Sequence, residues 1–543
     1  MKLPECECMA IEKEPLPTQR AELLMRLASP RVYDIAIVGG GATGLGVALD
    51  AAARGFSVVL VDSHDFAQGT SSRATKLVHG GVRYLAQGNV ALVREALHER
   101  TTLLHNAPHL AQPLAFVMPS YQWWEKPFYG VGLKLYDALA GKAGLGQTEF
   151  LSRAQTLNTL PTAQPQGLKG GVKYWDGQFN DARLALALAR TAASRGALLV
   201  NYCKAVNLLF EGGKVSGILC EDRETGQRLK LRARCVVNAT GVWVDGLRQQ
   251  DGDANPGDGR RPTLPMVAPS QGVHLVVDRD FLQADVGLMV PKTADGRVLF
   301  AVPWLGKVIL GTTDTPRDDM PLEPTPFKDE IDFILGESAR YLKRAPQRAD
   351  VKSVWVGLRP LVKPQGDDGD NTKGLSREHT ILVSRSGLVT VTGGKWTTYR
   401  AMAEDVLDKC FDRNLLPRRP SGATLDLPLI GATASIKRWR SICDSPGLHS
   451  YGSEEAAVQQ MPGTTRELAP GLTEAMVRFA ARHEYARTTE DVLARRSRLL
   501  FLDAKAAKGL GDQVGAILSE ETQRDPQNAE FSAITEKYLH LPA

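Results

Sequence analysis

The first clear pattern of hydrophobic and polar segments begins at residue 32. Residues 32–38, VYDIAIV, form an apolar run with the length of a buried strand. The glycine-rich stretch GGGATG follows, and the alanine-rich stretch LGVALDAAARG after it is typical of a helix. Residues 57–62, SVVLVD, form a second apolar run. This order predicts a βαβ unit, and therefore a parallel sheet that helices cover.

The hydrophobic pattern changes along the rest of the chain. Residues 182–195 have the pattern of a helix, whereas residues 198–237 hold strand-like segments separated by glycine and charged turns, which predicts hairpins. Residues 273–277 and 298–311 are strand-like again. From about residue 411 helical patterns dominate. No apolar run reaches the length of about 18 residues that a spanning helix requires, so we expect none.

Length and composition narrow the class of protein. A chain of 543 residues predicts two or three domains, and 43% hydrophobic and 23% charged residues are typical of globular proteins. The 66 basic and 61 acidic residues leave a net charge of only +5, so we expect no nucleic-acid partner. Seven cysteines indicate a reducing compartment rather than a disulfide framework. Prolines and acids near the N-terminus argue against an export signal.

A dinucleotide fingerprint lies inside the βαβ unit. Gly39, Gly41 and Gly44 form the pattern G-x-G-x-x-G between the predicted strand and helix, and Asp62 ends the next strand. Glycines at these positions allow backbone N–H groups to approach a pyrophosphate at a helix N-terminus, and the acid can accept hydrogen bonds from ribose hydroxyls. The pattern predicts an ADP-containing cofactor, but it does not by itself distinguish FAD from NAD.

Three features favour FAD. The βαβ unit stands at the start of the folded chain, and CVVNATG at 235–241 is a second strand that ends beside the cofactor, at Thr240 and Gly241. TVTGGKWTTYR at 390–400 reads as a strand, a turn and a helix start. A helix N-terminus there would stabilise negative charge on a reduced flavin ring. No cysteine or histidine stands in a recognisable tethering motif, so we expect non-covalent binding.

Several motifs together resemble one family. GGGATGLG is joined by TSSRATKLVHGGVRYL at 70–85, NATGVWVD at 238–245, GTTDTP at 311–316, GLRPL at 357–361 and GGKWTTYR at 393–400. This set resembles the FAD-dependent glycerol-3-phosphate dehydrogenases, from about residue 32 to about residue 510. The stretch YARTTEDVLARRSRLLFLD also resembles the helical C-terminal domain of that family.

The resemblance implies a fold and an activity. The fold would be a Rossmann-like FAD-binding domain, an antiparallel-sheet substrate domain and a C-terminal helical domain. We expect a tail over 1–31, a discontinuous FAD domain over 32–410 and the helical domain over 411–543. The substrate domain would be inserted at roughly 100–175 and 260–350.

The implied reaction is the oxidation of sn-glycerol 3-phosphate to dihydroxyacetone phosphate by hydride transfer to FAD. Electrons would pass to ubiquinone or menaquinone, with the protein peripheral on the cytoplasmic face of the inner membrane. Whether the protein forms a homodimer is left open at this point. The alternatives are an oxidase that uses oxygen on the same substrate, and another FAD-dependent amine or amino-acid oxidase. No metal site is expected, because Cys6 and Cys8 have no neighbouring ligand.

The chemistry of the reaction selects candidate residues. A phosphate dianion calls for cations, and Arg83, Arg359 and Lys395 stand in the shared motifs, with Tyr84 as a further hydroxyl. Histidine suits a base near neutral pH, and the resemblance favours His274, although Arg359 or Lys395 could take the proton. The remaining expected cofactor contacts are Thr70, Ser71, Ser72, Lys76, His79, Gly80, Gly81, Gly394 and Thr397.

One segment is a candidate for contact with a membrane. Residues 121–142, YQWWEKPFYGVGLKLYDALAGK, combine six aromatic residues with three lysines. Aromatic rings favour the headgroup region and lysines attract anionic lipid. The alternative is that these aromatics belong to the core of the substrate domain.

Overall fold

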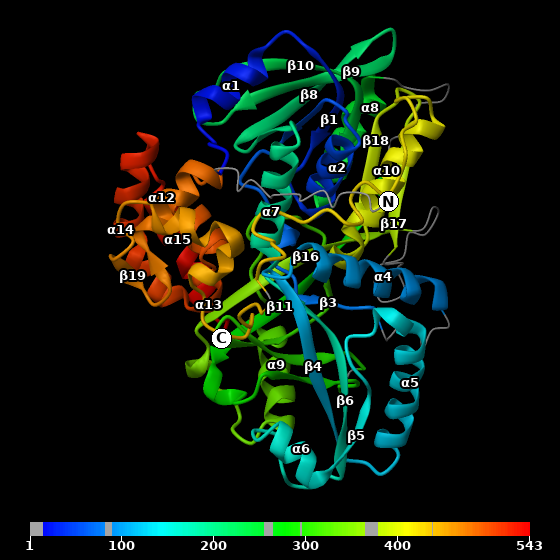
Figure 1. Cartoon of the computed structure of the whole chain (residues 1–543), viewed down its shortest axis with the longest axis vertical. Helices are drawn as coiled ribbons and strands as arrows, with labels where there is room; N and C mark the ends of the chain where they lie inside the picture. The colour runs from blue at the N-terminus through cyan, green and yellow to red at the C-terminus, as the bar shows by residue number, and fades with distance from the viewer. Residues whose placement is uncertain (1–14, 82–88, 255–263, 294–295, 364–377, 437) are drawn as a thin grey trace, which may run out of the picture.

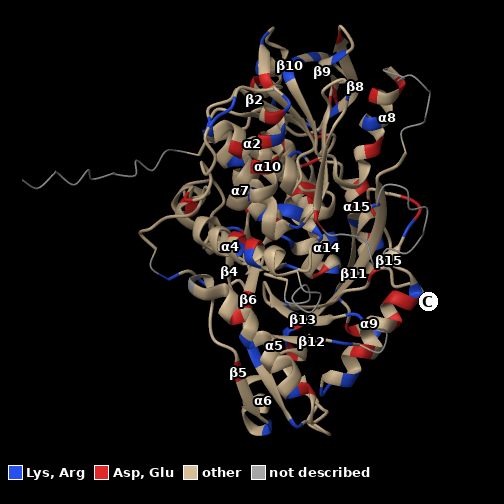
Figure 2. Cartoon of the chain, turned by 90° about the vertical axis from the view of Figure 1, so that its right-hand side faces the viewer, with Lys and Arg blue, Asp and Glu red and all other residues tan. Residues whose placement is uncertain are grey.

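The computed structural model describes residues 15–543 apart from 82–88, 255–263, 294–295, 364–377 and 437. Two large sheets organise these residues, one in the upper and one in the lower half of Figure 1. A cluster of helices from the C-terminal quarter packs at the side of both. Basic and acidic residues are interspersed along the described elements (Figure 2).

The first sheet has eight strands around the predicted βαβ unit. The strand order is β17-β18-β10-β1-β2-β7, and the antiparallel pair β8 and β9 extends from β10. β1, β2, β7, β10 and β18 run parallel, as a Rossmann-like sheet requires. The strands are β1 Val32–Val38, β2 Val58–Val61, β7 Leu198–Val200, β8 Cys203–Glu211, β9 Lys214–Asp222, β10 Arg228–Asn238, β17 His379–Val383 and β18 Val389–Gly393.

Three helices pack against one another over this sheet. α2 (Ala42–Ala53) contacts both α7 (Asp181–Ser194) and α10 (Tyr399–Asp412). Because α2 and α7 are rich in alanine, they approach each other and the strands closely, and nearly all of their residues are buried. The sheet therefore joins segments from residues 32–61, 198–238 and 379–393.

The second sheet has ten strands and is antiparallel except between β4 and β12. Its order is β15-β11-β14-β13-β12-β4-β6-β3, with β16 beside β11 and β5 beside β6. The strands are β3 Leu77–Val78, β4 Ala111–Ser120, β5 Glu149–Ser152, β6 Gly170–Phe179, β11 Val267–Asp278, β12 Val286–Val290, β13 Leu299–Trp304, β14 Lys307–Gly311, β15 Thr315–Pro316 and β16 Ser353–Val362.

The C-terminal quarter is helical and shares a core with the second sheet. Trp304 and Trp355 of that sheet lie in one hydrophobic cluster with Phe501 and Leu518 of the C-terminal helices. The helices are α11 Glu455–Gln459, α12 Glu474–His483, α13 Leu499–Leu502, α14 Ala504–Thr522 and α15 Asn528–Leu539, with a short π-helix, η9, at Asp491–Arg496 and a hairpin of β19 Glu467–Ala469 and β20 Leu472–Thr473. The predicted fold class is thereby confirmed.

Further helices surround the second sheet. α4 (Val90–Asn106) and α5 (Glu125–Ala140) contact each other, α6 (Arg153–Thr159) packs on β6, and α9 (Lys328–Tyr341) packs on β11 and β13. α8 (Val244–Ala254) follows β10 in the first half of the molecule. Among the residues that the structure describes, none of these helices has both the length and the apolar character needed to cross a bilayer.

The described end of the segment predicted as a tail differs from that expectation. Residues 20–28 form helix α1 (Arg20–Ala28), which packs on β7 and β10. Arg20 is buried, forms an ion pair with Asp222 and donates a hydrogen bond of 3.1 Å to the Tyr202 carbonyl. The mixed charge of this segment hid the helix in the sequence. Its buried arginine is neutralised by an acid 202 residues away, which no local pattern indicates.

Candidate active site

A cavity of about 610 Å³ opens at the carboxyl ends of the parallel strands. The turns after β1, β2 and β10, together with the end of β18, line it. This is the edge at which doubly wound sheets bind their ligands. The predicted cofactor residues that line the cavity are Gly39, Gly41, Asp62, Thr70, Ser71, Thr240, Gly241, Gly394 and Lys395.

The turn between β1 and α2 is packed too tightly for side chains. Gly39 has a φ of +110°, and a Cβ atom there would lie 2.5 Å from the Ala239 carbonyl oxygen. A Cβ on Gly44 would lie 1.9 Å from the Gly39 carbonyl oxygen. These glycines therefore let α2 begin directly at the cavity, with Gly41 as its N-cap. The positive end of the helix dipole suits a pyrophosphate.

Asp62 supplies a carboxylate at the end of β2. One of its oxygens accepts a hydrogen bond of 2.5 Å from the Gly40 N–H, and the other accepts one of 2.8 Å from the His64 N–H. Burial raises the pKa of the Asp62 carboxyl to about 6, although these hydrogen bonds oppose the shift. The carboxylate is thus oriented by backbone groups toward a cavity in which it can accept ribose hydroxyls.

Side-chain hydrogen bonds join the other walls. Ser71 lies in the 3₁₀ turn η1 (Thr70–Ser72), and its hydroxyl oxygen accepts a hydrogen bond of 2.9 Å from the Ala42 N–H at the start of α2. The Ser71 carbonyl accepts a hydrogen bond of 2.8 Å from Nε1 of Trp396, the first residue of η7 (Trp396–Thr398). The Thr392 hydroxyl donates a hydrogen bond of 3.0 Å to the carbonyl of Gly241, the first residue of η3 (Gly241–Trp243). Segments up to about 350 residues apart therefore form one continuous lining.

These features fit FAD. The close glycine turn, the helix N-terminus and the oriented carboxylate match the pyrophosphate and ribose of a dinucleotide. The volume lies within the range of cofactor sites. The lining also offers apolar surface from residues such as Trp243, Leu247 and Met402.

The other predicted cofactor residues lie outside the cavity lining. Gly44 and Ser72 are buried behind it, and Lys76 is fully buried with its ammonium 2.6 Å from Asp181 and 2.8 Å from the Ser72 carbonyl. Burial holds the pKa of Lys76 well below its usual value. His79, Gly80, Gly81 and Thr397 are near one another, since Thr397 Oγ1 donates 3.4 Å to the His79 carbonyl, but none of them is part of the lining.

His274 lies on the second sheet, next to the segment that follows η1. It is opposite Trp355 in the antiparallel pair β11/β16, and the two rings stack with centroids 4.0 Å apart. Its Nε2 is 2.9 Å from Thr75 Oγ1, and its Nδ1 is buried with no hydrogen-bond partner among the described residues. Burial, together with the charges of Lys76 and Arg359, lowers the pKa of His274 well below 6.5.

Arg359 lies on the same face of this strand pair. It is opposite Ser270, four residue pairs from the His274–Trp355 pair in the sheet register, and an even spacing keeps both on one face. Its guanidinium lies 3.1 Å from Asp314 and donates 3.0 Å to the Thr313 carbonyl. A Cβ on Gly272 would lie 2.4 Å from Arg359 Nη2, so this glycine leaves room for the guanidinium. Arg83 and Tyr84 lie outside the described residues.

The segment 70–76 brings the two groups of residues together. Thr70 and Ser71 line the cavity, and Thr75 bonds to His274. Sequence reasoning did not select Thr75 or Trp355, although Thr75 stands inside the quoted motif TSSRATKL. Hydroxyl groups are common in loops, so only the pairing with a histidine 199 residues away reveals its role.

Comparison with known proteins agrees with this geometry. A family model described as FAD dependent oxidoreductase matches residues 34–400, and the C-terminal domain of alpha-glycerophosphate oxidase matches residues 423–529. The mitochondrial glycerol-3-phosphate dehydrogenases of Rattus norvegicus and Schizosaccharomyces pombe are 40% and 38% identical to this chain. The alignments cover 95% and 93% of the chain, and 74% and 86% of those proteins.

The chain belongs to the FAD-dependent glycerol-3-phosphate dehydrogenase family. The family predicted from the sequence is thus confirmed, and so is FAD as its cofactor. A solved glycerol-3-phosphate dehydrogenase from Bacillus halodurans, in complex with FAD, superposes with a TM-score of 0.76 at 28% identity. That match covers 96% of this chain and 98% of the other. A glycerophosphate oxidase from Mycoplasma pneumoniae, at 17% identity and a TM-score of 0.54, shares the fold.

Proposed function

We propose that this chain oxidises sn-glycerol 3-phosphate to dihydroxyacetone phosphate, with non-covalent FAD in the cavity described above. The observation that carries the proposal is the segment 70–76, which joins the dinucleotide cavity to the His274 and Arg359 face of the second sheet. That sheet is then the substrate domain. When bound, FAD supplies the acceptor for the hydride that leaves the substrate carbon.

The substrate phosphate is assigned to the cations of the predicted motifs. Arg359 is held by Asp314 and by backbone carbonyls of residues 271 and 313, so its planar guanidinium is fixed before the substrate arrives. A fixed guanidinium suits bidentate binding of phosphate oxygens. Lys395, in the cavity lining, is the second cation of the proposed set. Arg83 and Tyr84 complete the proposed set.

His274 is assigned as the base. With Nε2–H donated to Thr75 Oγ1, the neutral ring presents Nδ1 as an acceptor. That atom is buried with no partner among the described residues, and a substrate hydroxyl would satisfy it. The lowered pKa of His274 keeps the ring unprotonated at neutral pH, as proton abstraction requires. The stacked Trp355 fixes the plane of the ring.

Membrane quinone, ubiquinone or menaquinone, is the proposed electron acceptor, and α5 is the proposed contact with the bilayer. The helix lies at the lower end of the molecule in Figure 1. Trp123 is 82% exposed, Phe128 and Val131 are each 67% exposed, and Leu135 is 53% exposed. Phe128, Val131 and Leu135 lie on one face of the helix, Trp123 lies in the turn just before it, and Lys134 is exposed beside them. An apolar stripe flanked by lysine suits a peripheral site on the cytoplasmic face of the inner membrane.

The opposite face of α5 is part of the protein core. Gly130, Leu133, Tyr136 and Ala140 are buried, and Tyr136 donates a hydrogen bond of 3.2 Å to Asp176. Of the aromatics in the predicted segment, Tyr136 therefore has a packing role, whereas Trp123, Trp124 and Phe128 are free to meet a lipid surface.

One experiment separates quinone from oxygen as the acceptor. Because the C-terminal family model bears the name of an oxidase, oxygen is the second candidate. Turnover of glycerol 3-phosphate is compared with a soluble ubiquinone analogue, a menaquinone analogue, an artificial dye and oxygen. We expect fast reduction of quinone and dye, with little hydrogen peroxide. Peroxide formation equal to substrate consumption would identify an oxidase, and absence of turnover with every acceptor would contradict the proposed substrate.

A further inference from the structure

A short segment of the C-terminal domain reaches the cofactor cavity from behind. The segment holds Arg495 and Arg496 of η9 and Arg498 just after it. All three side chains are buried. Their partners lie on two loops that also line the cavity, the loop after β2 and the turn η1.

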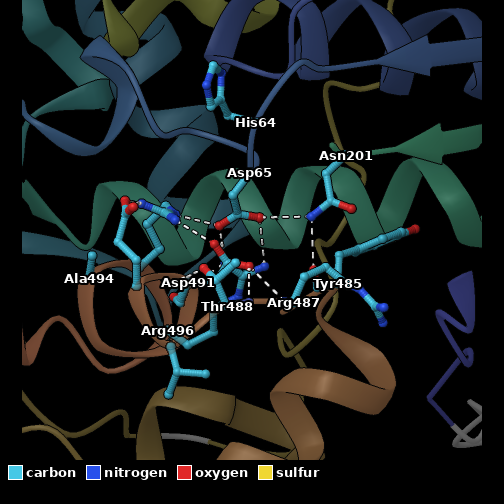
Figure 3. A network of polar contacts seen from close by, with 12 residues as sticks. His64, Asp65, Asn201, Tyr485, Arg487, Thr488, Asp491, Ala494 and Arg496 are labelled. Carbon is cyan, nitrogen blue, oxygen red and sulfur yellow. Dashed lines mark hydrogen bonds and ion pairs between the residues drawn. The ribbon is translucent and has the colours of Figure 1, made fainter. Parts of the chain in front are cut away.

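The first contact is with Asp65, three residues after the predicted ribose ligand Asp62. Asp65 lines the cavity, and its carboxylate forms ion pairs with Arg495 and with Arg496, whose Nη2 lies 3.0 Å away. Asn201 Nδ2 donates a further hydrogen bond of 3.1 Å. Figure 3 shows Asp65 at the centre of this network. The two guanidinium groups lower the pKa of Asp65, so the carboxylate is ionised in the folded protein.

Two successive arginines of η9 share the Asp65 carboxylate, and further contacts hold them in place. Arg495 is further held by Glu490 at 2.5 Å and Asp491 at 2.6 Å. Asp491 also accepts 2.6 Å from Tyr202, at the end of β7 in the first sheet. Contacts that do not involve Asp65 therefore also fix the position of Arg495.

The second contact is with the turn η1. Arg498 Nη2 donates a hydrogen bond of 2.7 Å to the Ser72 carbonyl oxygen. The same oxygen accepts a hydrogen bond of 2.8 Å from Lys76. Both cations share Asp181, which lies 3.3 Å from Arg498 and 2.6 Å from Lys76. Because Ser71 in this turn lines the cavity and bonds to the start of α2, Arg498 supports that wall of the cavity.

We propose that Arg495, Arg496 and Arg498 are positioning residues for FAD, through which the C-terminal domain sets the affinity of the cofactor cavity. Arg495 and Arg496 hold the loop that presents Asp62, and Arg498 holds the turn that presents Thr70 and Ser71. None of the three lines the cavity itself. The proposal rests on the placement of FAD in this cavity.

The same domain junction offers a matched control. Arg190 of α7 forms a bidentate ion pair with Glu454 of the C-terminal quarter, at 2.5 and 2.6 Å. This pair is also largely buried, and it joins the same two parts of the chain. Neither residue lines the cavity or contacts the loops that do. Arg190→Met therefore removes a comparable ion pair without touching the cofactor loops.

The test measures FAD release from the full-length holoenzyme. Dilution series of Arg496→Met, Arg496→Lys, Arg498→Met and Arg190→Met are followed by the recovery of free FAD fluorescence, and melting temperatures are recorded with and without added FAD. We expect the dissociation constant to rise about 10- to 100-fold for Arg496→Met and Arg498→Met, as removal of supporting contacts does. Arg496→Lys should lie between the wild type and Arg496→Met. Arg190→Met should lower the melting temperature but change FAD affinity by less than about threefold.

Each outcome bears on the proposal. Equal loss of FAD in Arg190→Met and Arg496→Met would mean that the arginines dock the domain and nothing more, and the proposal would fail. Unchanged FAD affinity in folded Arg496→Lys and Arg498→Met would also overturn it. If Arg496→Met does not fold, Arg496→Lys decides, because it keeps the buried charge. Asp62→Asn tests the placement of FAD separately: if it binds FAD as the wild type does, the cavity assignment itself is wrong.

Discussion

His274 shows how neighbours set the behaviour of a single residue. Its ring stacks on Trp355 and bonds to Thr75, while Lys76 and Arg359 place two positive charges nearby. Burial and these charges favour the neutral form, so the pKa of His274 is lowered. A base with a lowered pKa stays unprotonated as the pH falls.

The rate should therefore persist into mildly acid solution. We expect kcat at saturating glycerol 3-phosphate to stay level as the pH falls from 8 through 6.5, because the pKa of His274 is lowered well below its usual value. His274→Gln should lower kcat by about 10²- to 10⁴-fold, the usual share of a general base. The measurement is a pH profile with a dye acceptor at saturating FAD. A profile that falls with an apparent pKa near 6.5, or an unchanged kcat in His274→Gln, would exclude this role.

Arg359 should act on the phosphate and not on the alcohol. Arg359→Ala should cost about 2–4 kcal/mol of transition-state binding for glycerol 3-phosphate, or about 30- to 1000-fold in kcat/KM. The loss should be much smaller for glycerol, which has no phosphate. Arg359→Lys keeps the charge but not the planar fork, so an intermediate loss is expected.

The control for this variant is a nearby, half-buried arginine that pairs with an exposed acid. Arg317 also bonds to Gln271, but it pairs with the exposed Asp319. Arg317→Ala should leave the ratio of the two substrates unchanged. An equal loss for glycerol and glycerol 3-phosphate in Arg359→Ala would remove Arg359 from the phosphate site.

At the scale of elements, α5 separates stability from membrane contact. Its buried face packs in the protein, whereas the side chains of Trp123, Phe128, Val131 and Leu135 are mostly exposed. Replacing these four with serine should change the free energy of unfolding by less than about 2 kcal/mol in total, at about 0.5 kcal/mol or less for each surface position. The variant should be released from anionic vesicles. Co-sedimentation measures the release, and turnover with a soluble dye should survive.

The matched control for α5 uses exposed apolar residues of α1 and β1, which lie far from α5 in the sequence. Met25 and Val32 are also exposed apolar residues, at 69% and 55%. Their serine variants should bind vesicles as the wild type does. If the α5 variant still co-sediments, the contact with the membrane lies on another element.

The elements also show what sequence could predict. The βαβ unit was predictable because β1, α2 and β2 are contiguous and their apolar runs are local signals. Gly39, Gly41 and Asp62 followed from the same unit, and they line the cavity. The bond from Thr75 to His274 and the ion pair from Arg496 to Asp65 were not predictable, because each joins residues about 200 or more positions apart. Helix α1 was missed for the same reason, since Arg20 is satisfied only by distant strands.

At the scale of the whole molecule, the C-terminal domain completes the core of the second sheet. Trp355 contacts Phe501, with ring centroids 5.4 Å apart, and Trp304 lies in the same cluster. A chain that ends at residue 422 would expose these tryptophans and leave Asp65 and Asp181 without their arginine partners. Exposed apolar surface of this kind promotes aggregation.

We therefore expect the truncated chain to be insoluble or to retain little FAD. The measurements are the soluble fraction after expression and the flavin absorbance of the purified protein, with the full-length chain as control. A soluble truncated chain with a full complement of FAD would show that the first 422 residues form an independent unit, contrary to this prediction.

The order of strands in the first sheet has a consequence for biosynthesis. β1 lies beside β10, and β10 lies beside β18, which begins at residue 389. A ribosome adds about 5–20 residues per second, so roughly 15–70 s separate the emergence of β1 from that of β18. During that interval the nascent chain carries the glycine turn without the wall formed by residues 391–396. The flavin must consequently be loaded late, near or after release from the ribosome, and the hydrophobic strands of the unfinished sheet are the segments for which chaperones would compete.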